Sequence, residues 1–142
     1  MTASAVIIDT SVWSRLSSTA AVRGAMQELI ATTDPFLLWM CPPVAAELGF
    51  SARNGIDHTT LMLSLEAFPD CALHPSAHEV LDIQNALWTA GLVRSVGALD
   101  AQIAAYARKN DAVIVHLDRD FEHVASVIPG FTQRWLVPSS QL

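Results

Sequence analysis

Charged residues are scarce in this chain, and basic residues are the scarcest. Only 15% of the 142 residues are charged, with 8 Lys or Arg against 14 Asp or Glu, and the formal net charge is −6. A protein that coats nucleic acid through charge alone needs a basic stripe that neutralises phosphates. The composition excludes that class, so any contact with nucleic acid must be local.

Cysteines and long apolar runs are also few. Cys41 and Cys71 are the only cysteines, and they have no Cys-x-x-Cys spacing, which argues against a disulfide framework. We expect two buried thiols in a reducing compartment. Residues 1–5 form no basic leader, and no apolar run has the length of a membrane span. We therefore expect a cytoplasmic protein that does not contact a membrane.

Hydrophobic residues, by contrast, make up 51% of the chain. A chain of this length commonly forms one folded unit, and we expect a single domain over residues 1–142. Apolar and aromatic residues in excess of what one core needs are typical of interfaces. The composition therefore predicts that a partner or a second copy of the chain covers part of the surface.

Short β-branched runs alternate with segments of helical periodicity. Strands are predicted at 6–8, 36–40, 71–74, 112–117 and 131–137. Helices are predicted from near Thr10 and at about 21–31, 44–53, 57–68, 77–91, 98–109 and 121–126. Strands separated by helices imply right-handed crossovers. We therefore expect an α/β fold, a three-layer α/β/α sandwich around a central, largely parallel sheet.

Several polar residues carry helix-boundary signals. Thr10 and Ser11 offer hydroxyl caps to the first helix. Asn54-Gly55 is predicted to end one helix and Asp57 to cap the next. The run Ser76-Ala77-His78-Glu79 has the pattern of a capping box.

Four acidic residues occupy positions where a site could form. Asp9 and Asp118 follow predicted strands, and Glu47 and Asp100 lie near the beginnings of predicted helices. In an open parallel sheet the functional crevice lies beyond the carboxyl ends of the strands. Carboxylates brought together there would repel one another unless a hard divalent cation bound them. The pattern therefore predicts a Mg²⁺ or Mn²⁺ site, in which Asp120 could act as a ligand, a support or only a helix cap.

At this point the chain resembles a known family, the PIN-domain ribonucleases, and specifically the VapC-type toxins of bacterial type II toxin–antitoxin pairs. The resemblance spans nearly the whole chain and rests on the order and spacing of four segments. These are Ile7-Ile8-Asp9-Thr10-Ser11-Val12-Trp13, the Glu47 helix after Pro42-Pro43, the segment from Leu99 to Ala107 around Asp100, and Val115-His116-Leu117-Asp118-Arg119-Asp120-Phe121.

The resemblance implies a metal-dependent endoribonuclease with a PIN-like fold. Asp9, Glu47, Asp100 and Asp118 match the family's catalytic acids, with Asp9, Asp100 and Asp118 as ligands of Mg²⁺ or Mn²⁺. Thr10 or Ser11 matches its supporting hydroxyl position, and Asp120 is a supporting acid. The resemblance also implies attack by water that leaves a 5′-phosphate and a 3′-hydroxyl, a homodimer, and a cognate antitoxin that covers the active-site groove.

The few arginines are candidates for contacts to RNA phosphates. Arg94, in the predicted loop before the Asp100 helix, is the first choice, followed by Arg15 and Arg119, with Arg53 and Arg108 as weaker candidates. A solvated arginine or a surface ion pair remains the alternative for each. His116 is interpreted as a core histidine with its hydrogen bonds satisfied. Trp39, Trp88 and Trp135 are interpreted as core or interface anchors rather than base-stacking platforms.

Other functional classes fit the sequence less well. A P-loop is excluded because no Gly-rich run precedes a Lys-Ser or Lys-Thr pair. An aspartyl-phosphate enzyme or receiver domain would carry a second Asp two residues after Asp9, where this chain has Ser11. The alternative that remains is a non-catalytic PIN-like module that binds a protein partner and uses its acids structurally.

Overall fold

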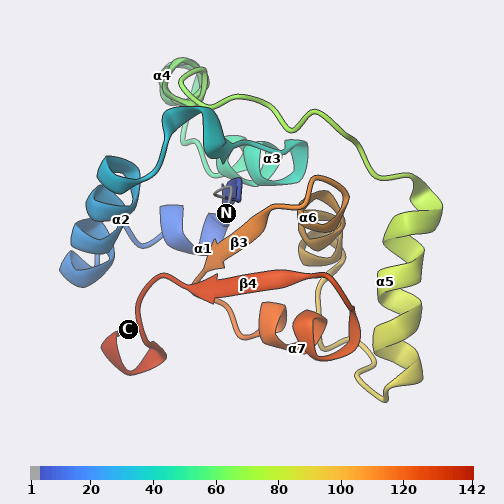
Figure 1. Ribbon diagram of the computed structural model, residues 1–142. Helices are drawn as coiled ribbons and strands as arrows, with labels where there is room; N and C mark the ends of the chain where they lie inside the picture. Colours follow the sequence, from blue (N-terminus) through green and yellow to red (C-terminus); the bar gives the residue numbers. More distant parts are fainter. Residues whose placement is uncertain (1–3) are drawn as a thin grey trace.

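The computed structural model describes residues 4–142. Residues 1–3, which belong to the predicted domain and to the N-terminal segment in which no leader is expected, lie outside that range. Its centre is a parallel sheet of four strands in the order β2-β1-β3-β4 (Figure 1). The strands are β1 (Val6–Ile8), β2 (Leu38–Trp39), β3 (Val113–His116) and β4 (Thr132–Trp135). The predicted α/β class and parallel sheet are confirmed.

The two faces of the sheet bury different side chains. Ile7 and Ile114 are adjacent in the β1–β3 register and belong to one apolar cluster, whereas Ile8 and Val115, the next pair, belong to the other. Successive side chains of a strand point to opposite faces, so strands covered on both sides read as continuous apolar runs. This is why the alternation of polar and apolar residues was absent from 6–8 and 112–117.

Helices cover both faces and complete the predicted three layers (Figure 1). The short α1 (Thr10–Trp13) and α2 (Ala20–Thr32) pack on the face of Ile8 and Val115. On the other face lie α3 (Pro42–Phe50), α5 (Ala77–Thr89), α6 (Ala98–Lys109) and α7 (Asp120–Val127). The helix α4 (Gly55–Leu65) packs against α3 and buries none of its side chains fully.

Of the five predicted strands, one is missing and those at 36–40, 112–117 and 131–137 are shorter than expected. Residues 71–74 form no strand, because one isolated bridge, Met40 to Asp70, is all that joins this segment to the sheet edge. Asn110 holds the segment instead, with its side chain bonded to both the N–H and the C=O of Leu73. Within 36–40 the chain forms a 3₁₀ turn, η1 (Pro35–Leu37), before β2 begins at Leu38.

Of the helix starts predicted for α4 and α5, the structure has the N-cap of α5 as predicted and a different N-cap for α4. The capping box at Ser76 and Glu79 is present as predicted. The prediction that Asp57 caps α4 is wrong: Asn54 is the N-cap, its side chain accepts from the Asp57 N–H at 2.9 Å, and Gly55 begins the helix. An Asn that could end one helix can equally cap the next, because its side-chain oxygen satisfies N–H groups of a first helical turn.

Both cysteines are free and buried, as predicted. Burial raises the pKa of Cys41 to about 12 and that of Cys71 to about 11, so both stay protonated at neutral pH. Within residues 4–142, no helix combines the length and the apolar character needed to cross a bilayer.

Candidate active site

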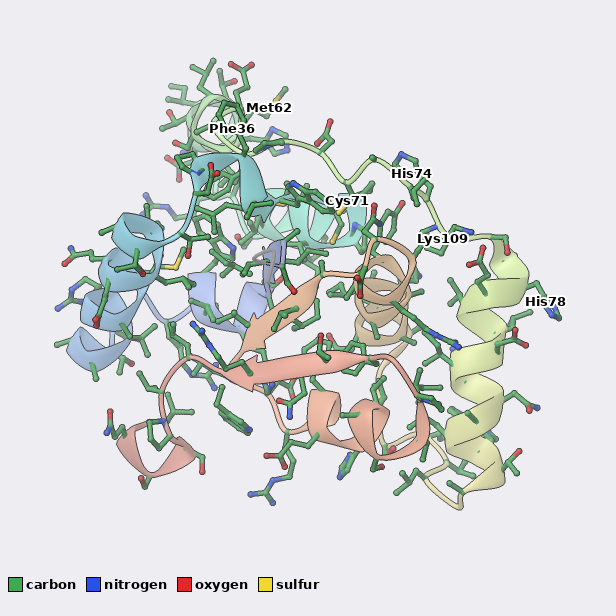
Figure 2. The ribbon with its side chains drawn as sticks, viewed as in Figure 1. Phe36, Met62, Cys71, His74, His78 and Lys109 are labelled. Carbon is green, nitrogen blue, oxygen red and sulfur yellow. The ribbon has the colours of Figure 1, made fainter. Side chains whose placement is uncertain are left out.

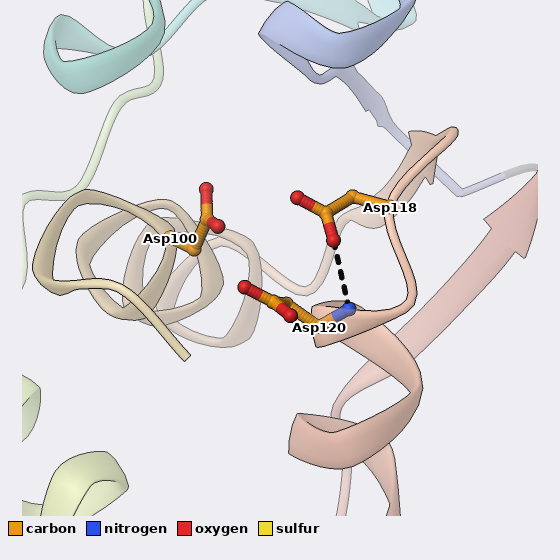
Figure 3. A group of neighbouring side chains, drawn as sticks. All are labelled: Asp100, Asp118 and Asp120. Atoms are coloured by element: carbon orange, nitrogen blue, oxygen red, sulfur yellow. Dashed lines mark hydrogen bonds between the residues drawn. The ribbon is translucent and has the colours of Figure 1, made fainter. Parts of the chain in front are cut away.

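Three aspartates form a compact cluster at the carboxyl edge of the sheet. Asp100 projects from the first turn of α6, Asp118 from the turn after β3, and Asp120 from the first position of α7 (Figure 3). One carboxylate oxygen from each lies within 4.8 Å of the others. The clustering follows from topology, because strands and helices that end or begin at one sheet edge bring their polar termini together.

Asp9 lies beside this cluster at the end of β1 and is only 2% exposed. Its Oδ2 accepts from the Ser11 N–H at 3.0 Å, so Asp9 itself is the N-cap of α1. Its Oδ1 is buried and has no hydrogen-bond partner within the described residues. A buried carboxylate oxygen without a partner is costly, and this oxygen is therefore a candidate ligand atom for a cation.

Glu47 joins the site through a contact between helices. The Thr10 hydroxyl donates to Glu47 Oε1 at 3.0 Å and ties α1 to α3. The Ser11 hydroxyl instead accepts from the Leu117 N–H at 2.9 Å and ties α1 to the turn after β3. The prediction that Thr10 and Ser11 cap α1 is therefore wrong, because Asp9 takes the cap and frees both hydroxyls for contacts with distant segments.

The carboxylates strongly affect one another's pKa. Burial, followed by repulsion from Asp9, Asp118, Asp120 and Glu47, raises the pKa of Asp100 to about 8. Burial also raises the pKa values of Asp9 and Asp120, and the charge of Asp118 adds to both. Within residues 4–142 no Lys or Arg side chain forms an ion pair with any of these acids. The potential metal ligands are all carboxylate oxygens, which are hard donors, and within the described residues no Lys or Arg neutralises their charge. Such a set of ligands fits Mg²⁺ or Mn²⁺.

His116, two residues before Asp118, is fully buried. Its Nδ1 accepts from the Asp118 N–H at 3.0 Å, and its Nε2 is hydrogen-bonded to Gln133 Oε1. The interpretation of His116 as a satisfied core histidine is confirmed, and burial lowers its pKa. Sequence reasoning missed Gln133. The one available signal was its position in the last strand, where a polar residue could face the sheet interior.

The candidate arginines differ in their positions. Arg119 is exposed between Asp118 and Asp120, and Arg94 is exposed in the loop before α6, with a φ of 60°. Arg15 donates to the Ser11 carbonyl at 3.0 Å and is half-buried. Arg53 forms an exposed ion pair with Asp57 at 2.8 Å. Arg108 lies at the opposite end of α6 from Asp100, away from the cluster.

Comparison with known proteins agrees with this arrangement. The family model for the PIN domain matches residues 6–127. The chain is 34% identical to Ribonuclease VapC51 of Mycobacterium tuberculosis over 96% of both proteins. It is 32% identical to Ribonuclease VapC21 of the same species over 79% of this chain and 86% of that protein.

Solved structures support the fold independently. The structure of VapBC-1 from nontypeable Haemophilus influenzae superposes with a TM-score of 0.71 and 21% identity, covering 92% of this chain and 97% of that one. The FitAcB structure from Neisseria gonorrhoeae gives a TM-score of 0.68 with 18% identity, covering 92% and 97%. The sheet, the acidic cluster at its carboxyl edge and these matches together show that the chain belongs to the PIN-domain family, in its VapC group.

Proposed function

We propose that this protein is a metal-dependent endoribonuclease toxin that a cognate antitoxin neutralises. The observation that carries the proposal is the cluster of Asp100, Asp118 and Asp120, with oxygens within 4.8 Å of one another and no basic side chain paired to them within the described residues. The similarity to proteins named VapC ribonucleases supports RNA as the substrate.

The proposed ligands of Mg²⁺ or Mn²⁺ are Asp9, Asp100 and Asp118, with Asp120 as a supporting or fourth acid. The unpaired Oδ1 of Asp9 and the raised pKa of Asp100 both support this set, because each group gains a favourable partner when a cation is bound. When present, the ion supplies Lewis acidity toward water and toward the scissile phosphodiester. These acids would hold the ion at the carboxyl edge of the sheet, where a backbone phosphate could approach.

In the proposed reaction a water oxygen forms a bond to phosphorus, and the bond from phosphorus to the 3′-oxygen breaks. The 3′-oxygen takes a proton from solvent, and the products are a 5′-phosphate and a 3′-hydroxyl. Glu47 is the proposed acceptor of the water's proton, and the Thr10 hydroxyl, at 3.0 Å, orients its carboxylate. Ser11 supports the site by holding the turn after β3.

Arg94 and Arg119 are the proposed contacts to flanking phosphates, since both are exposed and neither is paired with an acid within the described residues. Arg15 is the weaker candidate because its guanidinium is already bonded to the Ser11 carbonyl. With few other cations on the chain, binding should depend weakly on salt, as expected when only a few phosphates are neutralised.

The test is cleavage of a structured RNA by the pure chain with Mg²⁺ or Mn²⁺. Asp9→Asn and Asp118→Asn should lose activity, EDTA should abolish it, and excess Mn²⁺ should restore it to the wild type only. Asp82→Asn, an exposed acid on α5, is the matched control and should remain active. Equal cleavage by wild type and Asp118→Asn, or cleavage unaffected by EDTA, would favour the non-catalytic module.

The antitoxin is proposed to cover the active-site groove and to extend its contact over the apolar end of the molecule around α4. Phe36, Ile56, Met62 and Leu63 all expose more than half of their side chains there, and Figure 2 shows Phe36 and Met62 at this end. Exposed apolar surface of this kind is typical of interaction sites. Structural neighbours include VapBC complexes, which supports a partner protein for this chain. Met62→Asp with Leu63→Asp should prevent copurification of a coexpressed antitoxin without changing RNA cleavage.

A homodimer is proposed through α5. Leu81 and Trp88 are seven residues apart, so they share one helix face, and both are exposed. The interpretation of Trp88 as an interface anchor agrees with this position. Leu81→Asp should convert a dimer to a monomer in light scattering; a wild type that is monomeric at micromolar concentration would contradict the proposal. We also infer a cytoplasmic location, where the proposed RNA substrate is found and unpaired cysteines are stable.

A further inference from the structure

The turn after β3 is held by three side-chain acceptors, one from α1, one from the end of β3 and one from the turn itself. The N–H of Leu117 donates to Ser11 Oγ, that of Asp118 to His116 Nδ1 at 3.0 Å, and that of Asp120 to Asp118 Oδ1 at 2.9 Å. The backbone amides of Leu117, Asp118 and Asp120 therefore each have a defined side-chain partner. Only one of these partners, His116, has two possible neutral forms.

The hydrogen bonds select one form of the ring. Because the Asp118 N–H donates to Nδ1, that nitrogen carries a lone pair, and the ring proton of neutral His116 is on Nε2. Nε2 then donates to Gln133 Oε1 on β4. The opposite tautomer would point an N–H at the Asp118 N–H and leave the Gln133 oxygen without its donor.

Aromatic packing fixes the plane of the same ring. The centroids of His116 and Phe121 are 5.1 Å apart, and those of His116 and Trp135 are 5.0 Å apart. Phe121 follows Asp120 in α7, and Trp135 is paired in register with His116 across β3 and β4. The ring can therefore neither tilt nor flip without moving a fully buried phenylalanine.

We propose that His116 and Gln133 form a positioning pair that holds the Asp118 carboxylate for metal binding. This inference rests on the proposed function, since it takes Asp118 as a ligand. The pair acts through the backbone: the Asp118 N–H requires a lone pair on Nδ1, Gln133 Oε1 accepts from the resulting Nε2–H and holds the ring, and the carboxylate keeps its direction toward Asp100 and Asp120. Partners that orient metal ligands from behind commonly change metal affinity about 10- to 100-fold when removed.

Two amide substitutions separate this role from simple packing. In His116→Asn the amide oxygen sits at the same place along the side chain as Nδ1, so the acceptor for the Asp118 N–H is kept and the bond to Gln133 is lost. In His116→Gln the polar atoms sit at the place of Nε2, so the bond to Gln133 can form and the acceptor is lost. Both remove the ring from between Phe121 and Trp135 and should lower Tm by similar amounts.

The measurement is Mn²⁺ affinity of the full chain by titration, with Tm recorded for each variant. His116→Asn should bind Mn²⁺ within about threefold of wild type, and His116→Gln about 10-fold or more weakly. Gln133→Leu, at a half-exposed edge-strand position, changes no site residue and should weaken binding severalfold. If a His116 variant does not fold, Gln133→Leu decides the question by itself.

Ring ¹⁵N chemical shifts of the wild type give a second readout, and they should report the Nε2–H tautomer. The inference is overturned if the Nδ1–H tautomer is found, if Gln133→Leu binds Mn²⁺ as tightly as wild type, or if the two His116 variants lose affinity equally. A wild type that does not bind Mn²⁺ at all would instead overturn the proposed function, so the two failures are distinguishable.

Discussion

Replacing Asp100 by Asn should make the metal-free protein's stability less dependent on pH. Burial and repulsion by neighbouring carboxylates raise the pKa of Asp100 to about 8, against 3.8 for an ordinary aspartate. The folded state therefore binds more protons than the unfolded state between these two values. The stabilisation from the protonated form is complete below about pH 4 and is lost as the pH rises toward 8.

The magnitude follows from the slope of linkage. A group that is protonated when folded and ionised when unfolded lowers the free energy of unfolding by at most about 1.4 kcal/mol per pH unit. From pH 5 to 7 the upper bound is about 3 kcal/mol, and solvent near the half-buried carboxyl reduces it, so we expect a loss of about 1 to 3 kcal/mol. Asn resembles the protonated carboxyl in shape and carries no titrating proton.

Urea unfolding followed by tryptophan fluorescence, in EDTA at pH 5, 6 and 7, measures this loss. Wild type should lose stability as the pH rises, and Asp100→Asn should lose at least 1 kcal/mol less over the same range. Asp82→Asn, exposed on α5, should behave as wild type. Parallel pH profiles for wild type and Asp100→Asn would refute the electrostatic reasoning, because the mutual repulsion of the acids would then not be present in the folded protein.

Three further predictions test metal binding, the contact between α1 and α3, and a helix cap. Mn²⁺ at about 100 times its Kd should stabilise the wild type by about 2.7 kcal/mol and leave Asp118→Asn unchanged in thermal unfolding at pH 7; equal stabilisation would place the ion elsewhere. Thr10→Val, which removes the 3.0 Å bond to Glu47, should lower kcat for RNA cleavage at a stability cost of about 1 kcal/mol, and Thr10→Ser should restore it. Asn54→Ala should cost about 1 kcal/mol in urea unfolding through loss of the α4 cap with kcat unchanged, and a fall in kcat would link α4 to catalysis.

Local patterns were enough to predict the layers of the fold and the side of the sheet on which the acids lie. The β-branched runs at 6–8 and 112–117 can be buried on both faces only in a parallel sheet with helices on each side, and the structure has that sheet. Asp9 and Asp118 directly follow these runs, so chain direction alone assigns them to one edge. The capping box at Ser76 was equally local, because both of its partners lie within four residues.

Edge segments were predicted less well, for a physical reason. An edge strand is short and pairs with one neighbouring strand, so whether it forms depends on what the rest of the fold places beside it. Residues 71–74 have strand character but are held by the distant side chain of Asn110, 37 positions from Leu73. Both Asn54 and Asp57 have side chains that can cap a helix. Which of them caps α4 likewise depended on where the chain turns into the helix.

The sequence by itself determined the identity of the acids, their chain order and the direction of the strands that carry them. Only the tertiary structure decided what each side chain does: Asp9 caps α1 and keeps one oxygen unpaired, Thr10 binds Glu47, and Asp120 joins Asp100 and Asp118. The reason is that hydrogen bonds and pKa shifts depend on distances between groups up to 106 residues apart, as between Ser11 and Leu117. Propensity and spacing describe neighbours along the chain, whereas those distances are set by packing.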